Sequence, residues 1–187
     1  MTSRAASLAS ALQEWNAPPP FSPLRDEYLA FLAEHGEGAL ERSLGPEHIT
    51  ASCFVLSPGL DRVLLCFHRK GRFWVQLGGH IEPGDSSVAE AALREAREES
   101  GVAPLTPLGS RPLDLDRHGL GDGFGRCARH WDVGYGAIAD PSAPVAVSEE
   151  SEDVAWFAVD ALPEQVPPGF AGRLAGAVRA AHAVARP

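Results

Sequence analysis

The chain has 187 residues, of which 44% are hydrophobic and 22% charged, as expected of one globular domain able to form a core. Its formal net charge is −9 and Lys70 is its only lysine. This argues against a broad nucleic-acid groove, which needs a basic patch. No apolar run approaches the roughly 18 residues of a membrane span, and the first twelve residues do not resemble a secretory signal.

The cysteines indicate a reducing compartment. They are three in number, at positions 53, 66 and 127, and none forms a C-x-x-C pair. An odd count without such spacing argues against a disulfide framework or a zinc knuckle. We therefore expect a cytoplasmic protein in which Cys53 and Cys66, both in apolar runs, act as small buried hydrophobes.

Residues 1–47 are predicted to be a helical extension, separate from a domain over residues 48–187. Three prolines interrupt this segment at positions 18–20, and residues 24–33 then carry apolar side chains close to helical spacing. Residues 39–44 fit another short helix. The apolar faces must pack on the main domain or on a second subunit, so a homodimer is one expectation.

The rest of the chain alternates between strands and helices. Residues 49–56 and 62–68 are predicted to form a hairpin across the Pro58-Gly59 turn, and 73–77 a short strand. A helix is expected to start at Ser86 or Ser87 and to end at Gly101. Further strands are predicted near residues 105–108, 113–117, 130–138 and 154–157, with a terminal helix over 171–185. This order is typical of an α/β fold, an α/β/α sandwich around a mixed sheet.

The predicted central helix places three carboxylates on one face. Glu98 and Glu99 follow Glu95 by three and four residues, so all three side chains share one side of the helix. Without a cation, each such pair of like charges destabilises the helix by about a few tenths of a kcal/mol. A divalent cation reverses that sign, and clustered oxygen ligands suit Mg²⁺ or Mn²⁺.

This helix and the Gly-rich turn before it resemble the signature of the Nudix hydrolases, the MutT-like family, which reads Gly-x5-Glu-x7-Arg-Glu-U-x-Glu-Glu-x-Gly-U with U apolar. Two departures stand out: Asp85 replaces the first glutamate, and eight residues rather than seven separate it from Arg94. The matching positions are Gly79, Arg94, Glu95, Glu98, Glu99, Gly101 and Val102.

The resemblance implies a Nudix-type sandwich and metal-dependent hydrolysis of a diphosphate linked to another group, with water attacking phosphorus. Metal ions reduce the charge of the diphosphate and activate the water. Glu98 and Glu99 are the implied metal ligands, and Glu95 is either a ligand or the base. A backbone carbonyl at Gly79 is a further implied ligand. Arg94 is expected to point elsewhere on the helix. In the family, the arginine at this position orients the catalytic glutamate.

Three more acidic residues are candidates for an extra base or metal ligand. Asp85 either contacts an outer water of the metal or caps the helix. Family members often recruit such a group from a later loop, which makes Glu149 and Glu152 candidates. The alternative for both is a solvated acidic loop.

Substrate contacts are expected from five polar residues around the signature. His80 follows the Gly-Gly turn and is placed to hydrogen-bond a phosphate. His130 and Asp132 lie on one side of a predicted strand and are candidates for substrate contact, with an ordinary strand pair as the alternative. Arg69 and Arg72 belong to the one compact basic group, which either receives a second phosphate or keeps a hairpin end soluble.

The predicted function is therefore hydrolysis of a small, nucleotide-derived diphosphate, without a nucleic-acid polymer or a membrane as partner. The alternatives are a catalytically silent Nudix-like sensing or interaction module, and an isomerase of isoprenoid diphosphates on the same fold. Intact Arg94, Glu95, Glu98 and Glu99 argue against the silent module. The absence of a recognisable cysteine motif argues against the isomerase.

Overall fold

The computed structural model describes residues 2–18, 21–121, 127–149 and 151–185, so the predicted proline break and the Gly-rich loop over 119–125 lie partly outside the described residues. The helices are α1 (Arg4–Glu14), α2 (Phe21–His35), α3 (Val88–Ser100) and α4 (Phe170–Ala185), with 3₁₀ turns at Gly36–Leu40 and Arg42–Leu44. The strands are β1 (Glu47–Leu56), β2 (Arg62–His68), β3 (Phe73–Val75), β4 (Leu77–His80), β5 (Thr106–Pro107), β6 (Asp114–Gly119), β7 (Arg129–Ile138) and β8 (Ser151–Ala158).

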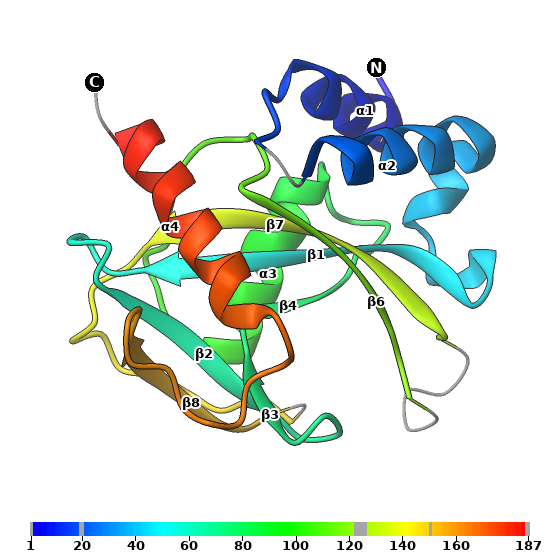
Figure 1. Ribbon diagram of the computed structural model, residues 1–187. Helices are drawn as coiled ribbons and strands as arrows, with labels where there is room; N and C mark the ends of the chain where they lie inside the picture. The colour runs from blue at the N-terminus through cyan, green and yellow to red at the C-terminus, as the bar shows by residue number, and fades with distance from the viewer. Residues whose placement is uncertain (1, 19–20, 122–126, 150, 186–187) are drawn as a thin grey trace.

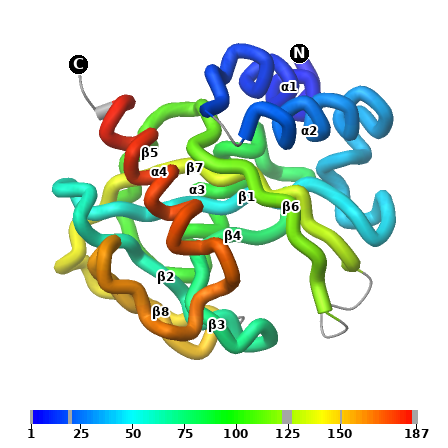
Figure 2. The backbone as a smooth tube through the Cα atoms, in the orientation of Figure 1, coloured from blue at the N-terminus to red at the C-terminus, as the bar shows by residue number. Residues whose placement is uncertain are grey.

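The strands form a mixed sheet around β1, as the sequence predicts. β1 pairs in parallel with β7 and antiparallel with β2 and β4. β3 and β8 extend the sheet from β2, and β5 and β6 extend it from β7. The strand predicted over 73–77 is two strands that separate at Gln76, because β3 pairs with β2 whereas β4 pairs with β1. Figure 2 shows β6 and β7 running side by side away from the rest of the sheet.

Helices cover both faces of the sheet, with α3 behind it and α4 in front (Figure 1). The alternation of side chains along β1 produces the two layers. Ile49, Ala51 and Cys53 join the core that contains the buried side of α3. Phe54 and Leu56 point the other way and join the core under α4. The fold is therefore the predicted α/β/α arrangement.

Local sequence sets both ends of α3 as predicted. The Ser87 hydroxyl accepts a hydrogen bond of 3.1 Å from the backbone N–H of Glu90, which caps the N-terminus. Gly101 ends the helix with φ 66°, a left-handed conformation that glycine adopts at little cost. Ala91, Ala92 and Ala96 are buried, so α3 packs on the sheet through small side chains.

The N-terminal helices pack on the sheet as part of the same core as α3. Phe31 stacks on Trp131 of β7, with 4.7 Å between ring centroids and 11° between planes. The fully buried Tyr28 hydroxyl donates to the carbonyl oxygen of Asp132 at 2.7 Å and lies 3.0 Å from that of Asp116. The division of the chain at residue 47 stays a prediction, but the apolar faces of the extension are buried on the main domain.

The cysteines and helices add two findings. Cys53, Cys66 and Cys127 are all buried and free, which agrees with the expected packing role of the first two. Within the described ranges, no helix is both long enough and apolar enough to cross a membrane.

Candidate functional site

Arg94 is the hub of the carboxylate cluster on α3. Its Nε and Nη2 donate to the two carboxylate oxygens of Asp85 at 2.9 and 3.0 Å. Its Nη1 donates to Glu95 and Glu98, each at 3.0 Å, and Nη2 also donates to the backbone carbonyl of His80 at 2.9 Å. The expectation that Arg94 points elsewhere on the helix is wrong, because its long side chain reaches back across the same face.

Asp85 is shaped by a tight turn and by Arg94. It accepts a 2.7 Å hydrogen bond from the backbone N–H of Glu82, and its own N–H donates to the Glu82 carbonyl. It is not the helix cap, a position that Ser87 takes. Burial alone would raise the pKa of Asp85, but the hydrogen bonds from Arg94 and Glu82 outweigh it and hold this pKa below its ordinary value. Asp85 is therefore ionised at neutral pH and anchors the guanidinium.

Glu95 and Glu99 lie against the bare backbone of β4. Glu99 is buried and accepts a 2.7 Å hydrogen bond from the N–H of Gly78. A Cβ atom placed on Gly79 would lie 2.8 Å from the Glu95 carboxylate. Only glycine leaves this space, so the Gly78-Gly79 pair lets the α3 carboxylates approach the strand closely. Glu98 is the outermost of the three, with a side chain 59% exposed.

These contacts predict an order of stability for three glycine-to-alanine variants. In Gly78→Ala, the new Cβ meets the backbone of Ala51 and Ser52 at 2.6 Å, so we expect a loss of about 1–3 kcal/mol in the free energy of unfolding. Gly79→Ala should lose less, since the carboxylate that it meets can swing aside. Gly84→Ala is the control, with open space around its Cβ. Urea unfolding measures all three, and a Gly78→Ala protein as stable as Gly84→Ala contradicts the packing argument.

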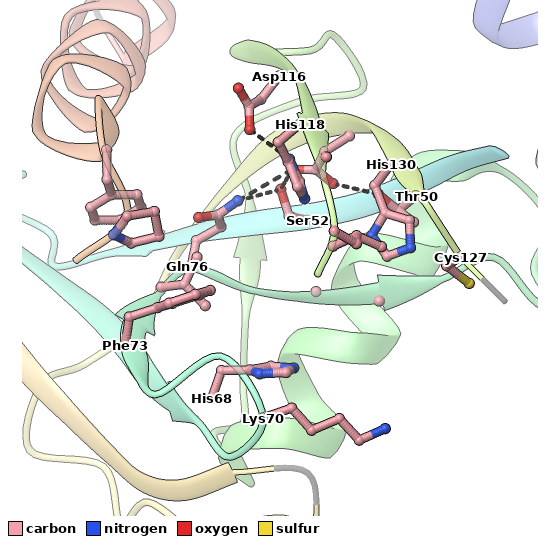
Figure 3. A pocket seen from close by; sticks show the side chains of 18 of the residues that line it. Thr50, Ser52, His68, Lys70, Phe73, Gln76, Asp116, His118, Cys127 and His130 are labelled. Atoms are coloured by element: carbon pink, nitrogen blue, oxygen red, sulfur yellow. Dashed lines mark hydrogen bonds and ion pairs between the residues drawn. The ribbon is translucent and has the colours of Figure 1, made fainter. Parts of the chain in front are cut away.

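A cavity of about 670 Å³ lies on the other side of β4 and is lined in part by Gly78 and Gly79. Figure 3 shows Phe73 at one end of it and His130 with Cys127 at the other. The polar residues Thr50 and Ser52 of β1 form its floor. The cavity is thus separated from the α3 carboxylates by two residues without side chains.

Asp132 organises the polar floor of this cavity. It is buried, and it accepts hydrogen bonds from Thr50 at 3.1 Å, from Ser52 at 2.6 Å and from Gln76 at 3.2 Å. Because the Gln76 amide nitrogen donates to Asp132, its carbonyl oxygen is directed elsewhere, and this buried oxygen has no partner among the described residues. The floor therefore presents an unused acceptor.

Arg173 of α4 balances the acidic residues next to that floor. It donates to Asp114 at 2.5 and 2.9 Å and to Asp116 at 2.9 Å, and it lies 3.5 Å from Asp132. Burial nevertheless raises the pKa of Asp114 against the attraction of Arg173. For Asp116, burial is outweighed by the His118 hydrogen bond and by Arg173, which lower its pKa. One guanidinium thus serves three neighbouring carboxylates.

The compact basic group predicted around residue 70 is divided by the structure. His68, Arg69 and Lys70 line the cavity. Arg72 does not appear in that lining and instead pairs with Glu152 on β8. Glu149, the other acidic candidate of this region, does line the cavity. The structure therefore brings Arg69 and Glu149 to the cavity together and joins Arg72 to Glu152 outside it.

His80 and His130, both predicted from the sequence as candidates for substrate contact, lie at the same end of the cavity. Their ring centroids are 5.3 Å apart, and His48 of β1 lies 5.0 Å from each. Burial first, and then the neighbouring histidines and Arg42, lower the pKa of His80 to about 4 and that of His130 to about 3. Both rings are neutral at physiological pH.

Several residues of this region were not predicted from the sequence. The alternation of polar side chains at 48, 50 and 52 was a usable signal, because it marks one face of a strand that is otherwise apolar. Residues from the terminal helix and from the segment before β7 carried no such signal. The missed residues are His48, Thr50, Ser52, Gln76, Asp114, Asp116, Cys127 and Arg173.

The chain is similar in sequence and fold to several known proteins. The NAD-capped RNA hydrolase NudC of two Pseudomonas aeruginosa strains is 36% identical over 121 residues, which cover 62% of this chain but only 38% of that protein. A NUDIX-family hydrolase from Clostridium perfringens has a TM-score of 0.57 and 25% identity, covering 73% of this chain and 97% of that one. The MutT protein of Methanosarcina mazei Go1, at 19% identity and TM-score 0.58, covers 73% of this chain and 96% of its own and shares the fold.

The family assignment rests on the part of the chain that carries both the sheet and α3. The family model described as the NUDIX domain matches residues 46–176, well over half of the sequence. That span contains the Gly-Gly strand, the Arg94 hub and the three helix carboxylates. The chain belongs to the Nudix family.

Proposed function

We propose that this protein hydrolyses the diphosphate linkage of a small nucleoside diphosphate derivative with the help of a divalent metal ion. The observation that carries the proposal is the position of Glu95 and Glu99. Both lie against Gly78 and Gly79, which in turn line a cavity of about 670 Å³. Cavities of this size suit small-molecule ligands, typically about 300–1,000 Å³.

The donor set fits Mg²⁺ or Mn²⁺. Glu95, Glu98 and Glu99 offer carboxylate oxygens and Gly79 a backbone carbonyl, all hard ligands. When bound, the ion supplies charge neutralisation for the diphosphate and makes a bound water more acidic. Arg94 keeps Glu95 and Glu98 at fixed positions through its two 3.0 Å hydrogen bonds. Preorganised ligands lose less freedom when they bind a cation.

The water-activating base is one of two residues in this proposal. Glu95 belongs to the carboxylate face and lies next to the strand that borders the cavity. Glu149 approaches from the loop before β8 and lines the cavity itself. Comparing the pH dependence of turnover in Glu95→Gln and Glu149→Gln separates them, because loss of the base removes the acidic limb of the profile.

The substrate is proposed to lie with its phosphates near β4 and its nucleoside over the floor. Arg69 and Lys70 supply positive charge along the cavity wall. Asp132 and the free acceptor of Gln76 suit sugar hydroxyls or the amino group of a base. Phe73 offers an aromatic face at the far end.

A metal-dependent substrate screen tests this function. Purified protein should release phosphate-containing products from at least one of four compound classes in Mg²⁺ or Mn²⁺: nucleoside triphosphates, ADP-ribose, nucleotide sugars and dinucleotides such as NAD. An NAD-capped RNA belongs in the screen because of the name of the Pseudomonas relatives. Chelator should abolish turnover and added metal restore it, and turnover should rise toward mildly alkaline pH as the base and ligands ionise.

The same screen separates the alternatives. A silent binding module shows ligand-induced stabilisation without products. An isoprenoid diphosphate isomerase rearranges its substrate without breaking the diphosphate. Full hydrolysis in excess chelator, or a phosphorylated enzyme trapped by mass spectrometry, contradicts attack by water with metal assistance.

A further inference from the structure

Four metal-binding side chains meet at the end of the cavity remote from Phe73. They are His48, His80, Cys127 and His130, and one ligand atom from each lies within 4.8 Å of the others. Three strands bring them together. His48 of β1 pairs with His130 of β7, while His80 of β4 pairs with Thr50, two residues along β1. All three histidines therefore lie on the same face of the sheet.

The buried nitrogen atoms of this cluster need a partner. Both ring nitrogens of His48 and Nε2 of His130 are buried without a hydrogen-bond partner within the described parts of the chain. Burial lowers the pKa of His48, and the nearby backbone of Gly45 only partly opposes this effect. Burying such groups without a partner is unfavourable, which points to a ligand that binds there.

We propose that these four side chains form a tetrahedral zinc site, distinct from the carboxylate site on α3. Three imidazoles and a thiolate are ligands that Zn²⁺ accepts and Mg²⁺ does not favour. Usual zinc bond lengths place tetrahedral ligand atoms roughly 3.3–3.7 Å apart. The Cys127 sulfur lies 4.0 Å from Nε2 of His80 and the whole set lies within 4.8 Å, so small side-chain movements complete the site.

The surrounding backbone holds the ligands in place. The N–H groups of Ala128 and Arg129 both donate to the carbonyl of Pro46, at 2.8 and 3.0 Å, which fixes the segment next to Cys127 against the start of β1. The His80 carbonyl accepts from Arg94, the hub of the other site. Four protein ligands fill a tetrahedral shell, which is the pattern of structural zinc sites. The ion thus ties β1, β4 and β7 together.

This assignment gives His80 and His130 a role other than the substrate contact expected from the sequence. It also explains why a buried cysteine lies beside the cavity rather than in an apolar core. Arg42 also lines the cavity, and its positive charge repels a cation bound there. The Cys127 thiolate reduces this repulsion, because it lowers the charge of the bound Zn²⁺ from +2 to +1. His118 is a neighbour, 5.7 Å from His130 between ring centroids, but its Nδ1 is 2.8 Å from Asp116.

The test uses full-length protein without a histidine tag and does not depend on turnover. Elemental analysis should find about one zinc per chain after dialysis, as expected for a structural site. With Co²⁺ in place of zinc, the protein should show the strong visible bands of tetrahedral cobalt and a thiolate-to-cobalt absorption. Cys127→Ser should remove the thiolate absorption and weaken binding, while His118→Ala, the matched control, should keep both.

Two further variants keep the outcome clear. Glu98→Gln should retain its zinc, because it removes a ligand of the carboxylate site only. His130→Gln should lose zinc while its circular dichroism remains that of a folded protein. A cobalt spectrum without thiolate absorption, or folded Cys127→Ser and His130→Gln proteins that bind zinc as tightly as the wild type, overturns the proposal. Because binding is the readout, an inactive protein that holds zinc contradicts only the hydrolase function.

Discussion

Replacing Glu98 with glutamine is expected to lower turnover by at least about a hundredfold, a rise of roughly 2.7 kcal/mol in the activation free energy. Glutamine keeps the size of the side chain but removes the negative charge that holds a divalent cation. The side chain of Glu98 is 59% exposed, so its loss leaves the core untouched. Steady-state kinetics with saturating Mg²⁺ and thermal unfolding of the same preparation measure the two effects.

Glu90→Gln is the matched control for this variant. It makes the same chemical change on the exposed first turn of α3, away from the carboxylate face. Turnover and stability of the control should stay near those of the wild type, since exposed substitutions usually change stability by less than about 0.5 kcal/mol. Near-normal activity of Glu98→Gln in Mg²⁺ contradicts its assignment as a metal ligand. Equal losses in both variants indicate a general effect of charge on the helix.

Local sequence was sufficient to predict α3 and its resemblance to the Nudix signature. Ser87 and Gly101 set its ends through backbone geometry, and both effects depend on residues within one turn of the helix. The spacing of Glu95, Glu98 and Glu99 fixes their shared face without any knowledge of the fold. The β1–β2 hairpin was predicted for the same reason, because its turn lies within the chain segment that it joins.

The cavity could not be predicted because distant segments build it. Arg173 lies 41 residues from Asp132 in the sequence, and no local pattern indicates that the terminal helix reaches the polar floor of the cavity. Cys127 approaches His48 only because β1 and β7 pair in parallel. The direction of Arg94 was missed for a different reason: helix spacing does not show how far a long side chain reaches, and Asp85 in the preceding turn determines where its guanidinium lies.

Replacing Arg94 with methionine is expected to lower the free energy of unfolding at neutral pH by about 2–4 kcal/mol, toward the range for breaking a buried ion pair. Asp85, whose side chain is only 6% exposed, then keeps its charge without its bidentate partner. The loss also frees Glu95 and Glu98, so turnover should fall by roughly a hundredfold, as misplaced catalytic groups do. Urea unfolding and Mg²⁺-dependent kinetics measure both effects.

The pH dependence of this variant tests the cause of its instability. In the wild type, the lowered pKa of Asp85 contributes stability that is complete above the unfolded pKa and is lost as pH falls through the folded pKa. Without Arg94, Asp85 takes up its proton at higher pH. The stability difference between the two proteins should therefore be largest near neutral pH and shrink in acid. Arg97→Met, which removes an exposed arginine one turn further along α3, is the control and should show little change at any pH. A deficit for Arg94→Met that is constant from neutral to acidic pH contradicts the role of the Asp85 pair, and points instead to lost packing of the arginine stem.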